Sequence, residues 1–144
     1  MIQEMSSDLF GERFAVFTPK PSMEEIKLAK ALVEDAADEA EEAEKQREYA
    51  EMARTLIARS ENEESRCELR KIAVWHYERC ADGFRRAVVS FESAAKIQKT
   101  EAQRRRPLER AARHAELAMQ AELAILELKT GEKKKKGGSN NETG

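Results

Sequence analysis

Apolar residues recur at steps of three and four through the first half of the chain, and most of them are small. The series consists of Ile26, Ala29, Val33, Ala36, Ala40, Ala43, Ala50, Ala53 and Ile57. Its steps add up to heptads, with Arg47 in one position, and Ser22 with Glu25 offers a capping box just ahead of it. The pattern predicts one long helix from about residue 22 to 59, whose alanines allow a neighbouring helix to approach closely.

A bulkier apolar stripe follows the polar segment RSENEES at 59–65. Ser65 and Glu68 offer a second capping box in this region, so we expect the chain to reverse direction there. The stripe consists of Leu69, Ile72, Ala73, His76, Cys80, Phe84, Ala87, Val88, Phe91 and Ala94. Because its phase passes Gly83 without a break, the pattern favours one second helix that runs to about residue 102.

A third helical pattern begins near Pro107, which suits the first turn of a helix because its missing N–H would have no partner there. Its apolar line consists of Leu108, Ala112, Ala115, Met119, Leu123 and Leu126. We expect Gly131 to end this helix, and the sequence EKKKKGGSNNETG that follows has the composition of a disordered tail. The chain thus divides into an N-terminal arm at 1–21, a helical bundle at 22–130 and a Lys-rich tail at 131–144.

Three helices joined by short polar loops favour an all-α fold, an antiparallel three-helix bundle with two long helices and a shorter third. At 1.5 Å per residue the first two helices would span roughly 50 to 57 Å and the third only about 35 Å. A short third helix would leave the loop end of the first two thinly covered. Five apolar residues near that end form a candidate partner-binding surface: Leu56, Ile57, Leu69, Ile72 and Trp75.

The composition suits long amphipathic helices. Charged residues make up 38% of the 144 positions, hydrophobic residues 40%, and the net charge is -2. This balance argues against a chain built wholly to bind nucleic acid or a membrane surface, because such proteins carry a global positive excess. Because no apolar stretch could span a membrane and a secretory signal pattern is missing, we expect a cytoplasmic protein.

Two cysteines, Cys67 and Cys80, lie in the predicted second helix with their backbones about 20 Å apart. This separation is too large for a disulfide, so we expect free, partly buried thiols, which fit a reducing compartment. His76 and Cys80 share a helical face at a spacing that could place two metal ligands, but no second pair of ligands lies nearby. We therefore expect a core histidine beside a core cysteine and no metal site.

Motifs for catalysis are missing from the sequence. It contains no P-loop, no dinucleotide-binding fingerprint and no nucleophile elbow. His114 is the only other histidine, and neither histidine has a glutamate three residues before it, as di-iron bundles require. We expect neither a cofactor nor enzyme activity.

The segment ADGFRRAVVSFESAA has a spacing found in helical repeats. The positions concerned are Gly83, Phe84, Ala87, Phe91 and Ala94. Similar slots, displaced by 34 residues in either direction, hold Ala50, Ala53 and Ile57 and also Ala118, Ala121 and Ile125. Residues 82–94 therefore resemble the second half of a tetratricopeptide repeat, and more loosely the chain resembles the three-helix microtubule-interacting and trafficking domain. Both resemblances imply peptide binding rather than catalysis.

Charge is distributed unevenly along the chain. Between Glu34 and Glu48 there are eight acidic residues against two basic ones, whereas between Lys96 and Arg113 there are seven basic residues against two acidic ones. One interpretation is that these segments are solvated, or face each other across the bundle and help to set its antiparallel order. The other is a phosphate-binding patch, extended by the lysines at 133–136, that consists of Lys96, Lys99, Arg104, Arg105, Arg106, Arg110 and Arg113.

Three of the five phenylalanines lie in the arm ahead of the first helix: Phe10, Phe14 and Phe17. Pro19 and Pro21 make the segment between arm and helix a stiff, non-helical hinge. Fully extended, the arm reaches at most about 35 to 40 Å from this hinge, which is short of the far end of the first two helices. The arm either folds back over the nearer half of its own bundle or anchors in a groove on a neighbouring subunit or partner.

These features favour a non-enzymatic helical protein that works by protein–protein contact, as a small structural or adaptor subunit, or a chaperone, of a larger cytosolic assembly. Self-association or a protein partner is expected because the heptad-bearing helices present more apolar surface than one short third helix can cover. The alternative is a nucleic-acid-associated protein that uses the basic cluster at 96–113 and the lysine tail.

Overall fold

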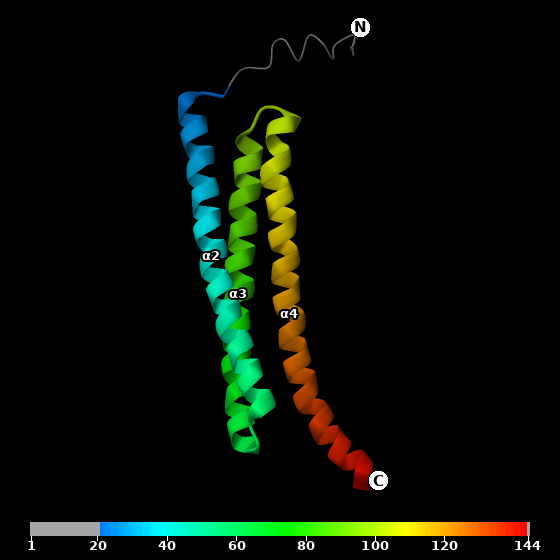
Figure 1. The fold of residues 1–144 in the computed structure, drawn as a ribbon. Helices are drawn as coiled ribbons and strands as arrows, with labels where there is room; N and C mark the ends of the chain where they lie inside the picture. The colour runs from blue at the N-terminus through cyan, green and yellow to red at the C-terminus, as the bar shows by residue number, and fades with distance from the viewer. Residues whose placement is uncertain (1–20, 144) are drawn as a thin grey trace.

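A computed structural model describes the backbone of residues 21–143 and the side chains of residues 21–131. This part of the chain forms three helices: α2 (Met23–Arg59), α3 (Glu63–Ile97) and α4 (Glu101–Thr143). Consecutive helices run in opposite directions and are joined by short turns (Figure 1). The predicted all-α fold, an antiparallel three-helix bundle, is confirmed. Phe10, Phe14 and Phe17 of the predicted arm lie outside the described residues.

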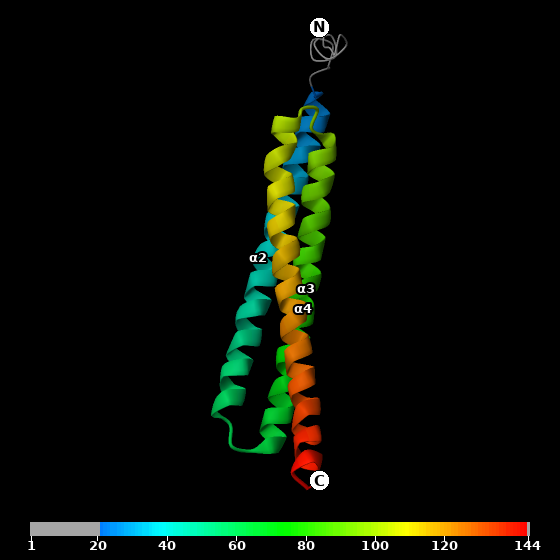
Figure 2. The ribbon, with the colours of Figure 1, turned by 90° about the vertical axis from the view of Figure 1, so that its right-hand side faces the viewer.

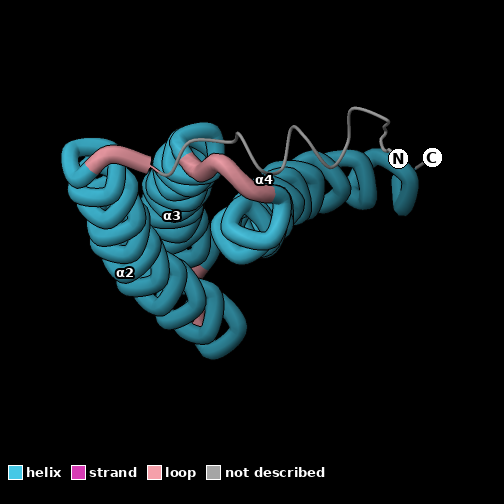
Figure 3. The backbone as a smooth tube through the Cα atoms, turned by 90° about the horizontal axis from the view of Figure 1, so that it is seen from above, coloured by secondary structure: helices cyan, strands magenta, loops and turns pink. Residues whose placement is uncertain are grey.

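α3 is the middle helix and packs against both of the others. α2 and α4 each lie along α3 and make few contacts with each other, so the three helices form a bent row when seen from above (Figure 3). α2 and α4 both begin at the end of the molecule where α3 ends (Figure 2). Because α3 is shared by two outer helices, it has to supply most of the core.

Side-chain hydrogen bonds fix where the first two helices begin. Ser22 Oγ accepts a hydrogen bond from Glu25 N at 3.1 Å and Glu25 Oε1 accepts one from Ser22 N at 2.9 Å, so the capping box predicted for α2 is present. The cap predicted at Ser65 is wrong. Asn62 caps α3 instead, because its Oδ1 accepts hydrogen bonds from Glu64 N at 2.8 Å and Ser65 N at 3.2 Å.

The turn 98–100 leads from α3 into α4, so α3 ends before the expected residue 102. Thr100 starts α4: its Oγ1 accepts a hydrogen bond from Gln103 N at 3.1 Å, and its carbonyl oxygen accepts one from Arg104 N at 3.1 Å. Pro107 consequently lies inside the helix rather than in its first turn. At this position the ring removes the backbone hydrogen bond to the carbonyl of Gln103 and crowds that carbonyl, which costs a helix about 3 kcal/mol.

α4 is longer than expected at both ends. Its 43 residues exceed the 37 of α2 and the 35 of α3, whereas a shorter third helix at 107–130 was predicted. Gly131 does not end it, and the backbone remains helical to Thr143. Glycine inside a helix costs only about 1 kcal/mol relative to alanine, so it need not stop one. The side chains after Gly131, in the region predicted to be a disordered tail, lie outside the described part of the chain.

The interface between α2 and α3 is built on small side chains. The buried residues of the predicted seam on α2 are Ala29, Ala36, Ala43, Ala50 and Ala53. Gly83 of α3 lies against this seam: a Cβ added to it would be 2.9 Å from Ala43 Cβ and 3.4 Å from the carbonyl oxygen of Glu39. The close approach expected from the alanine seam is therefore present, and α3 runs through Gly83 as one continuous helix.

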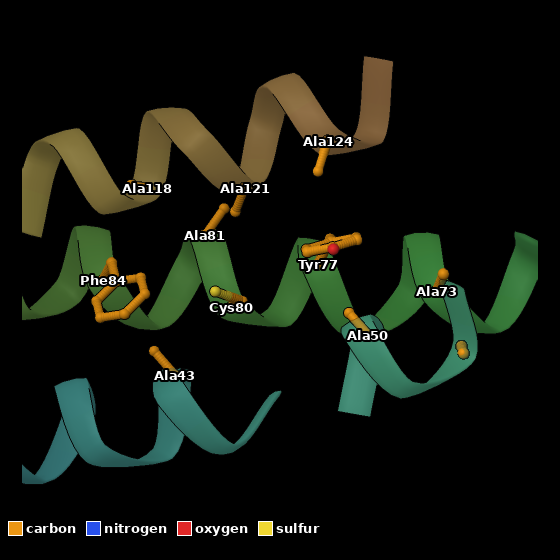
Figure 4. Packing of buried hydrophobic residues seen from close by; sticks show 11 residues of the cluster. Ala43, Ala50, Ala73, Tyr77, Cys80, Ala81, Phe84, Ala118, Ala121 and Ala124 are labelled. Atoms are coloured by element: carbon orange, nitrogen blue, oxygen red, sulfur yellow. The ribbon is translucent and has the colours of Figure 1, made fainter. Parts of the chain in front are cut away.

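The bulky residues of the core come from α3. Phe84 and Cys80 are the largest fully buried side chains, and Tyr77 and Phe91 are buried as well. In Figure 4, the side chains of Tyr77, Cys80 and Phe84 project between alanines of α2 on one side and alanines of α4 on the other. Because α3 fills the interior from the middle, its two neighbours contribute mainly small side chains.

α4 packs on α3 through a face different from its apolar line. The buried residues of α4 are Ala111, Ala118, Ala121 and Ala124. The apolar line identified from the sequence is exposed instead, and we call it the α4 stripe: Leu108, Ala112, Ala115, Met119, Leu123 and Leu126. The rings of Phe84 and Phe91 already occupy the space in front of α4, so its fully buried positions are alanines. Leu117, Ile125 and Leu128 pack partly buried at the edge of the same core.

Candidate protein-binding surfaces

The apolar residues predicted to bind a partner lie at the end of the molecule where α2 turns into α3. Three of them are about half exposed, with exposed fractions of 49% for Leu56, 46% for Ile72 and 52% for Trp75. Ile57 and Leu69 are less exposed and belong partly to the interior. Of the five residues predicted to form a surface at this end, three are therefore exposed and two are partly buried.

The cause of this exposure differs from the one suggested by the sequence. α4 is not short at this end, because its Leu128 packs against the core cluster that contains Tyr77. Trp75 also lines one hollow on the surface together with Arg70, Lys71, Val74, Glu78, Leu128 and Lys129. Ile72 and Trp75 are exposed because they lie on the part of the α3 circumference that neither neighbouring helix covers.

Aromatic rings connect α2 and α3 beside Trp75. The ring centroids of Trp75 and His76 are 4.8 Å apart in an edge-on arrangement, and those of Tyr49 and His76 are 5.4 Å apart. The guanidinium carbon of Arg79 lies 4.7 Å from the centre of the Trp75 ring, within reach of a cation–π interaction. We call the resulting set of exposed residues the hairpin-end surface: Tyr49, Leu56, Ile72, Trp75 and Arg79.

Tyr49 was not among the residues predicted from the sequence. Tyr49, Met52 and Leu56 follow each other at steps of three and four and are all exposed on α2. They form a second, shorter apolar stripe beside the alanine seam. This signal is readable in the sequence once more than one stripe per helix is considered.

His76 joins the two helices through a hydrogen bond. Its Nδ1 lies 2.7 Å from Gln46 Oε1 on α2, and Gln46 Nε2 donates to Glu42 Oε2 at 2.9 Å. Because a carbonyl oxygen can only accept, Nδ1 carries a proton in this arrangement. Partial burial, followed by the nearby charge of Arg79, lowers the pKa of His76 below its ordinary value of 6.5. These contacts make His76 a neutral packing residue.

Cys80 belongs to the same interior. It is fully buried, and this burial raises the pKa of its thiol to about 11. Cys67 is only partly buried, and both cysteines are free, as predicted from their separation along one helix. Among the side chains that the structure describes, no group of three or more histidine, cysteine, aspartate or glutamate residues could hold a metal ion.

The predicted phosphate-binding residues lie where α3 passes into α4, but two of them are engaged within the bundle. Lys99 pairs with Glu25 of α2 at 3.3 Å, and the guanidinium of Arg110 lies 5.8 Å from the centre of the Phe91 ring. Both side chains are partly buried. Arg104 is exposed but donates a hydrogen bond from Nε to the carbonyl oxygen of Gln98 at 2.9 Å. The remaining four are exposed: Lys96, Arg105, Arg106 and Arg113.

The exposed bases do not form one face. Consecutive residues of a helix point about 100° apart, so Arg104, Arg105 and Arg106 spread around α4. Lys96 and Arg104 do share one hollow, which is also lined by Glu92, Ala95 and Leu108. The cluster therefore surrounds the start of α4 and forms no single basic groove along it.

The acidic segment of α2 does not face the basic start of α4. Most of its side chains are exposed, and Glu39 pairs with Arg86 of α3. α2 and α4 make few contacts, and one ion pair between them, Arg54 with Glu127 at 3.3 Å, lies far from both segments along the chain. The interpretation in which the two charged segments meet across the bundle is wrong, and the solvated interpretation holds for the acidic one.

No helix in the described residues is both long and apolar enough to cross a membrane.

No protein family, curated protein or solved structure matches the chain. The resemblance of residues 82–94 to a tetratricopeptide repeat therefore rests on spacing alone. A function has to be argued from the surfaces themselves.

Proposed function

We propose that this protein is a non-enzymatic helical module for protein–protein interaction, a small structural or adaptor subunit, or a chaperone, of a larger cytosolic assembly. The observation that carries the proposal is the hairpin-end surface. Its large apolar side chains remain about half exposed beside a buried core cluster that contains Ala50, Ala73 and Tyr77. Exposed apolar groups of this size, collected at one end of a molecule, are typical of a contact site for another protein.

The residue types of this surface support the proposal. Tryptophan, tyrosine and arginine are the side chains most enriched among residues that dominate binding energy, and Trp75, Tyr49 and Arg79 supply one of each. Ring contacts with His76 and the cation–π contact already hold them in place. A surface that is ordered before binding loses less conformational entropy on association.

The titratable groups with shifted pKa values also fit a binding role better than a catalytic one. Cys80 lies inside the core, and His76 is held by Gln46. The pKa of Glu25 is lowered by its hydrogen bond to the Ser22 backbone and then by Lys99, so it acts as a helix cap. His76 and Cys80 lie one turn apart in the middle of α3, whereas Glu25 lies at the start of α2, so the three groups do not converge on one site.

Purification of variants from the native host tests the proposal. The double variant Trp75→Ala, Ile72→Ala removes the centre of the hairpin-end surface, and Val89→Ala is a matched control because Val89 is 60% exposed on the same helix. We expect a partner that the wild-type chain and the control retain in quantitative mass spectrometry, and that the double variant loses at least tenfold. A partner that all three chains retain equally would show that this surface is not the binding site.

A second candidate function, association with nucleic acid, is favoured by the five exposed bases around the start of α4. Binding to duplex DNA and single-stranded RNA should be measured at low and moderate salt, with Arg105→Ala, Arg106→Ala as the variant. An affinity that falls steeply with salt, and that the variant lowers, would support this function. Absence of binding at low salt would remove it.

A further inference from the structure

The α4 stripe is the largest unpaired apolar feature on α4. All four large hydrophobic side chains of α4 that are exposed in the described residues belong to it: 46% of Leu108, 58% of Met119, 52% of Leu123 and 59% of Leu126 are accessible. Leu108, Ala112, Ala115 and Met119 follow each other at steps of four, three and four. This is the spacing of a coiled-coil seam.

The middle of the stripe points away from the rest of the bundle, whereas Leu108 and Leu126 at its two ends each line a hollow beside α3. Met119 and Ala121 are two residues apart and therefore lie about 200° apart around the helix, and Ala121 is buried against α3. α4 is also an outer helix of the row, with α3 on its inner side and α2 beyond α3 (Figure 3). A second helix can therefore approach the stripe without displacing α2 or α3.

We propose that the α4 stripe is a homodimer seam, in which the α4 helices of two copies of this chain pair in antiparallel orientation. The seam is separate from the hairpin-end surface and goes beyond the proposed function, because its occupant is a second copy of the same chain. Such a two-fold contact uses the same stripe on both copies.

The sizes of the side chains match in the antiparallel orientation. If the two-fold axis passes between Ala115 and Met119, Ala115 of one copy lies opposite Met119 of the second, and Leu108 lies opposite Leu126 of the second. The two central layers then combine Ala115 with Met119, the next layer on each side places Ala112 opposite Glu122, and the outer layers combine two leucines. A parallel pair would place Ala115 against Ala115 and Met119 against Met119, so its layers would alternate between underfilled and crowded.

Charge selects the same orientation. Residues 101–115 of α4 contain five arginines and two glutamates, whereas residues 116–143 contain five glutamates and five lysines and carry no net charge. Antiparallel pairing places the arginine-rich half of each helix along the half of the other that carries no net charge. Parallel pairing would bring the arginines at 104–106 of both copies together, which is electrostatically unfavourable.

The acidic residue closest to the seam is already compensated. Glu122 takes the heptad position between Met119 and Leu126, and its carboxylate pairs with Arg85 of α3. This ion pair holds the carboxylate of Glu122 toward α3, which leaves Leu123 to supply apolar surface at that level.

The seam extends from Leu108 to Leu126, about 27 Å of helix. Two helices paired over this length bury on the order of 1,000 Å², which is typical of a weak, concentration-dependent dimer.

Sedimentation of the full-length chain over a range of concentrations tests the seam. We expect wild-type protein to dimerise, and Met119→Glu to weaken dimerisation at least tenfold without changing the helical circular dichroism signal. Val89→Glu, which places the same charge at an exposed apolar position of α3, should dimerise like wild type. A wild-type chain that stays monomeric at several hundred micromolar would overturn the proposal. So would a Met119→Glu variant that dimerises unchanged.

The same data separate this seam from other occupants and from the proposed function. A monomeric wild type whose melting temperature falls in Met119→Glu would show that another segment of the same chain covers the stripe, which contradicts a dimer seam. The Trp75→Ala, Ile72→Ala variant should dimerise normally. Loss of dimerisation in that variant would show that copies associate through the hairpin-end surface and would overturn the α4 seam.

Cysteine cross-linking tests the orientation in a Cys67→Ser background. An equimolar mixture of Leu108→Cys and Leu126→Cys chains should form a mixed disulfide dimer under mild oxidation. Neither variant alone should cross-link, because identical positions lie far apart in an antiparallel pair. Cross-linking of Leu108→Cys chains with each other would show a parallel pair and would overturn the antiparallel assignment.

Discussion

At the scale of single residues, the closest contact between α2 and α3 depends on the missing side chain of Gly83. A Cβ there would lie 2.9 Å from Ala43 Cβ, which is closer than van der Waals contact allows. Gly83→Ala gains about 1 kcal/mol of helix propensity, but forcing two packed helices apart costs roughly 1 to 3 kcal/mol. We expect the variant to lower the free energy of unfolding by about 1 kcal/mol, as measured by urea denaturation.

Gly131 provides the matched control for this prediction. It also lies in a helix, but a Cβ added to it has no neighbouring atom within 4 Å. Gly131→Ala should therefore raise the free energy of unfolding by up to about 1 kcal/mol. If Gly83→Ala stabilises the protein as much as Gly131→Ala does, the two helices do not approach closely at Gly83.

The two cysteines should differ in reactivity. Cys80 is fully buried and its thiol pKa is raised to about 11, so at pH 8 only about one molecule in a thousand carries the reactive thiolate. In the native protein a disulfide reagent such as DTNB should modify Cys67 quickly and Cys80 only as the protein unfolds. Cys67→Ser should abolish the fast phase, whereas Cys80→Ser should keep it. Fast modification of both thiols in wild type would contradict the buried position of Cys80.

His76 should make stability depend on pH. Its pKa is lowered by partial burial and then by Arg79, so below pH 6.5 the unfolded chain binds a proton more readily than the folded protein does. The contribution of His76 to the free energy of unfolding is therefore complete above about pH 7 and declines as the pH falls through 6.5. His76→Asn can still donate to Gln46 but does not titrate. Its free energy of unfolding should decline less than that of wild type between pH 7 and pH 5, and an equal decline would contradict the prediction.

At the scale of elements, α4 shows why a pattern can predict a helix and still leave its orientation open. Two faces of α4 have regular spacing, one of alanines and one of larger residues, and the sequence favours the more hydrophobic one as the core. The structure buries the alanines, with Leu117, Ile125 and Leu128 partly buried beside them, because Phe84 and Phe91 of α3 already fill the interior. The space available to the side chains of one helix depends on the side chains of its neighbour. The pattern of α4 alone therefore could not show which of its two faces packs against α3.

Substitutions on the two faces of α4 should change the free energy of unfolding by very different amounts. Ala121 is 3% exposed, so Ala121→Leu should overpack the interface with α3 and lower the free energy of unfolding by roughly 1 to 3 kcal/mol. Met119→Ala should change it by less than about 0.5 kcal/mol when measured at a protein concentration where the chain is monomeric. Chemical denaturation of both variants provides the comparison. A large loss for Met119→Ala would mean that the stripe packs inside the bundle after all.

The helix starts and the candidate surface were predictable to different degrees. Ser22 and Glu25 act locally, and their capping box was readable because both partners lie within one turn. Trp75 and Ile72 were readable as apolar residues near the loop, and Arg79 lies one turn from Trp75 on the same helix. Tyr49 joins them only because two helices meet. A sequence pattern identifies one helical face at a time, so a surface assembled across helices is found only in part.

At the scale of the whole molecule, α3 supplies the bulky core residues that pack against both of its neighbours. Because α2 and α4 make few contacts with each other, either one can separate from α3 while the other stays packed. α3 cannot become exposed on all sides unless both helices leave. Local opening should therefore cost more free energy in α3 than in either outer helix.

Hydrogen exchange measures this difference directly. We expect the slowest amide exchange in the middle of α3, between Tyr77 and Phe91, where buried residues follow each other most closely. The amides at 104–106 of α4, whose side chains are all exposed, should exchange much faster although they lie past the unbonded first turn of the helix. Equal protection in all three helices would show that the bundle opens only as one unit. In that case the few contacts between α2 and α4 would have to contribute far more stability than their number implies.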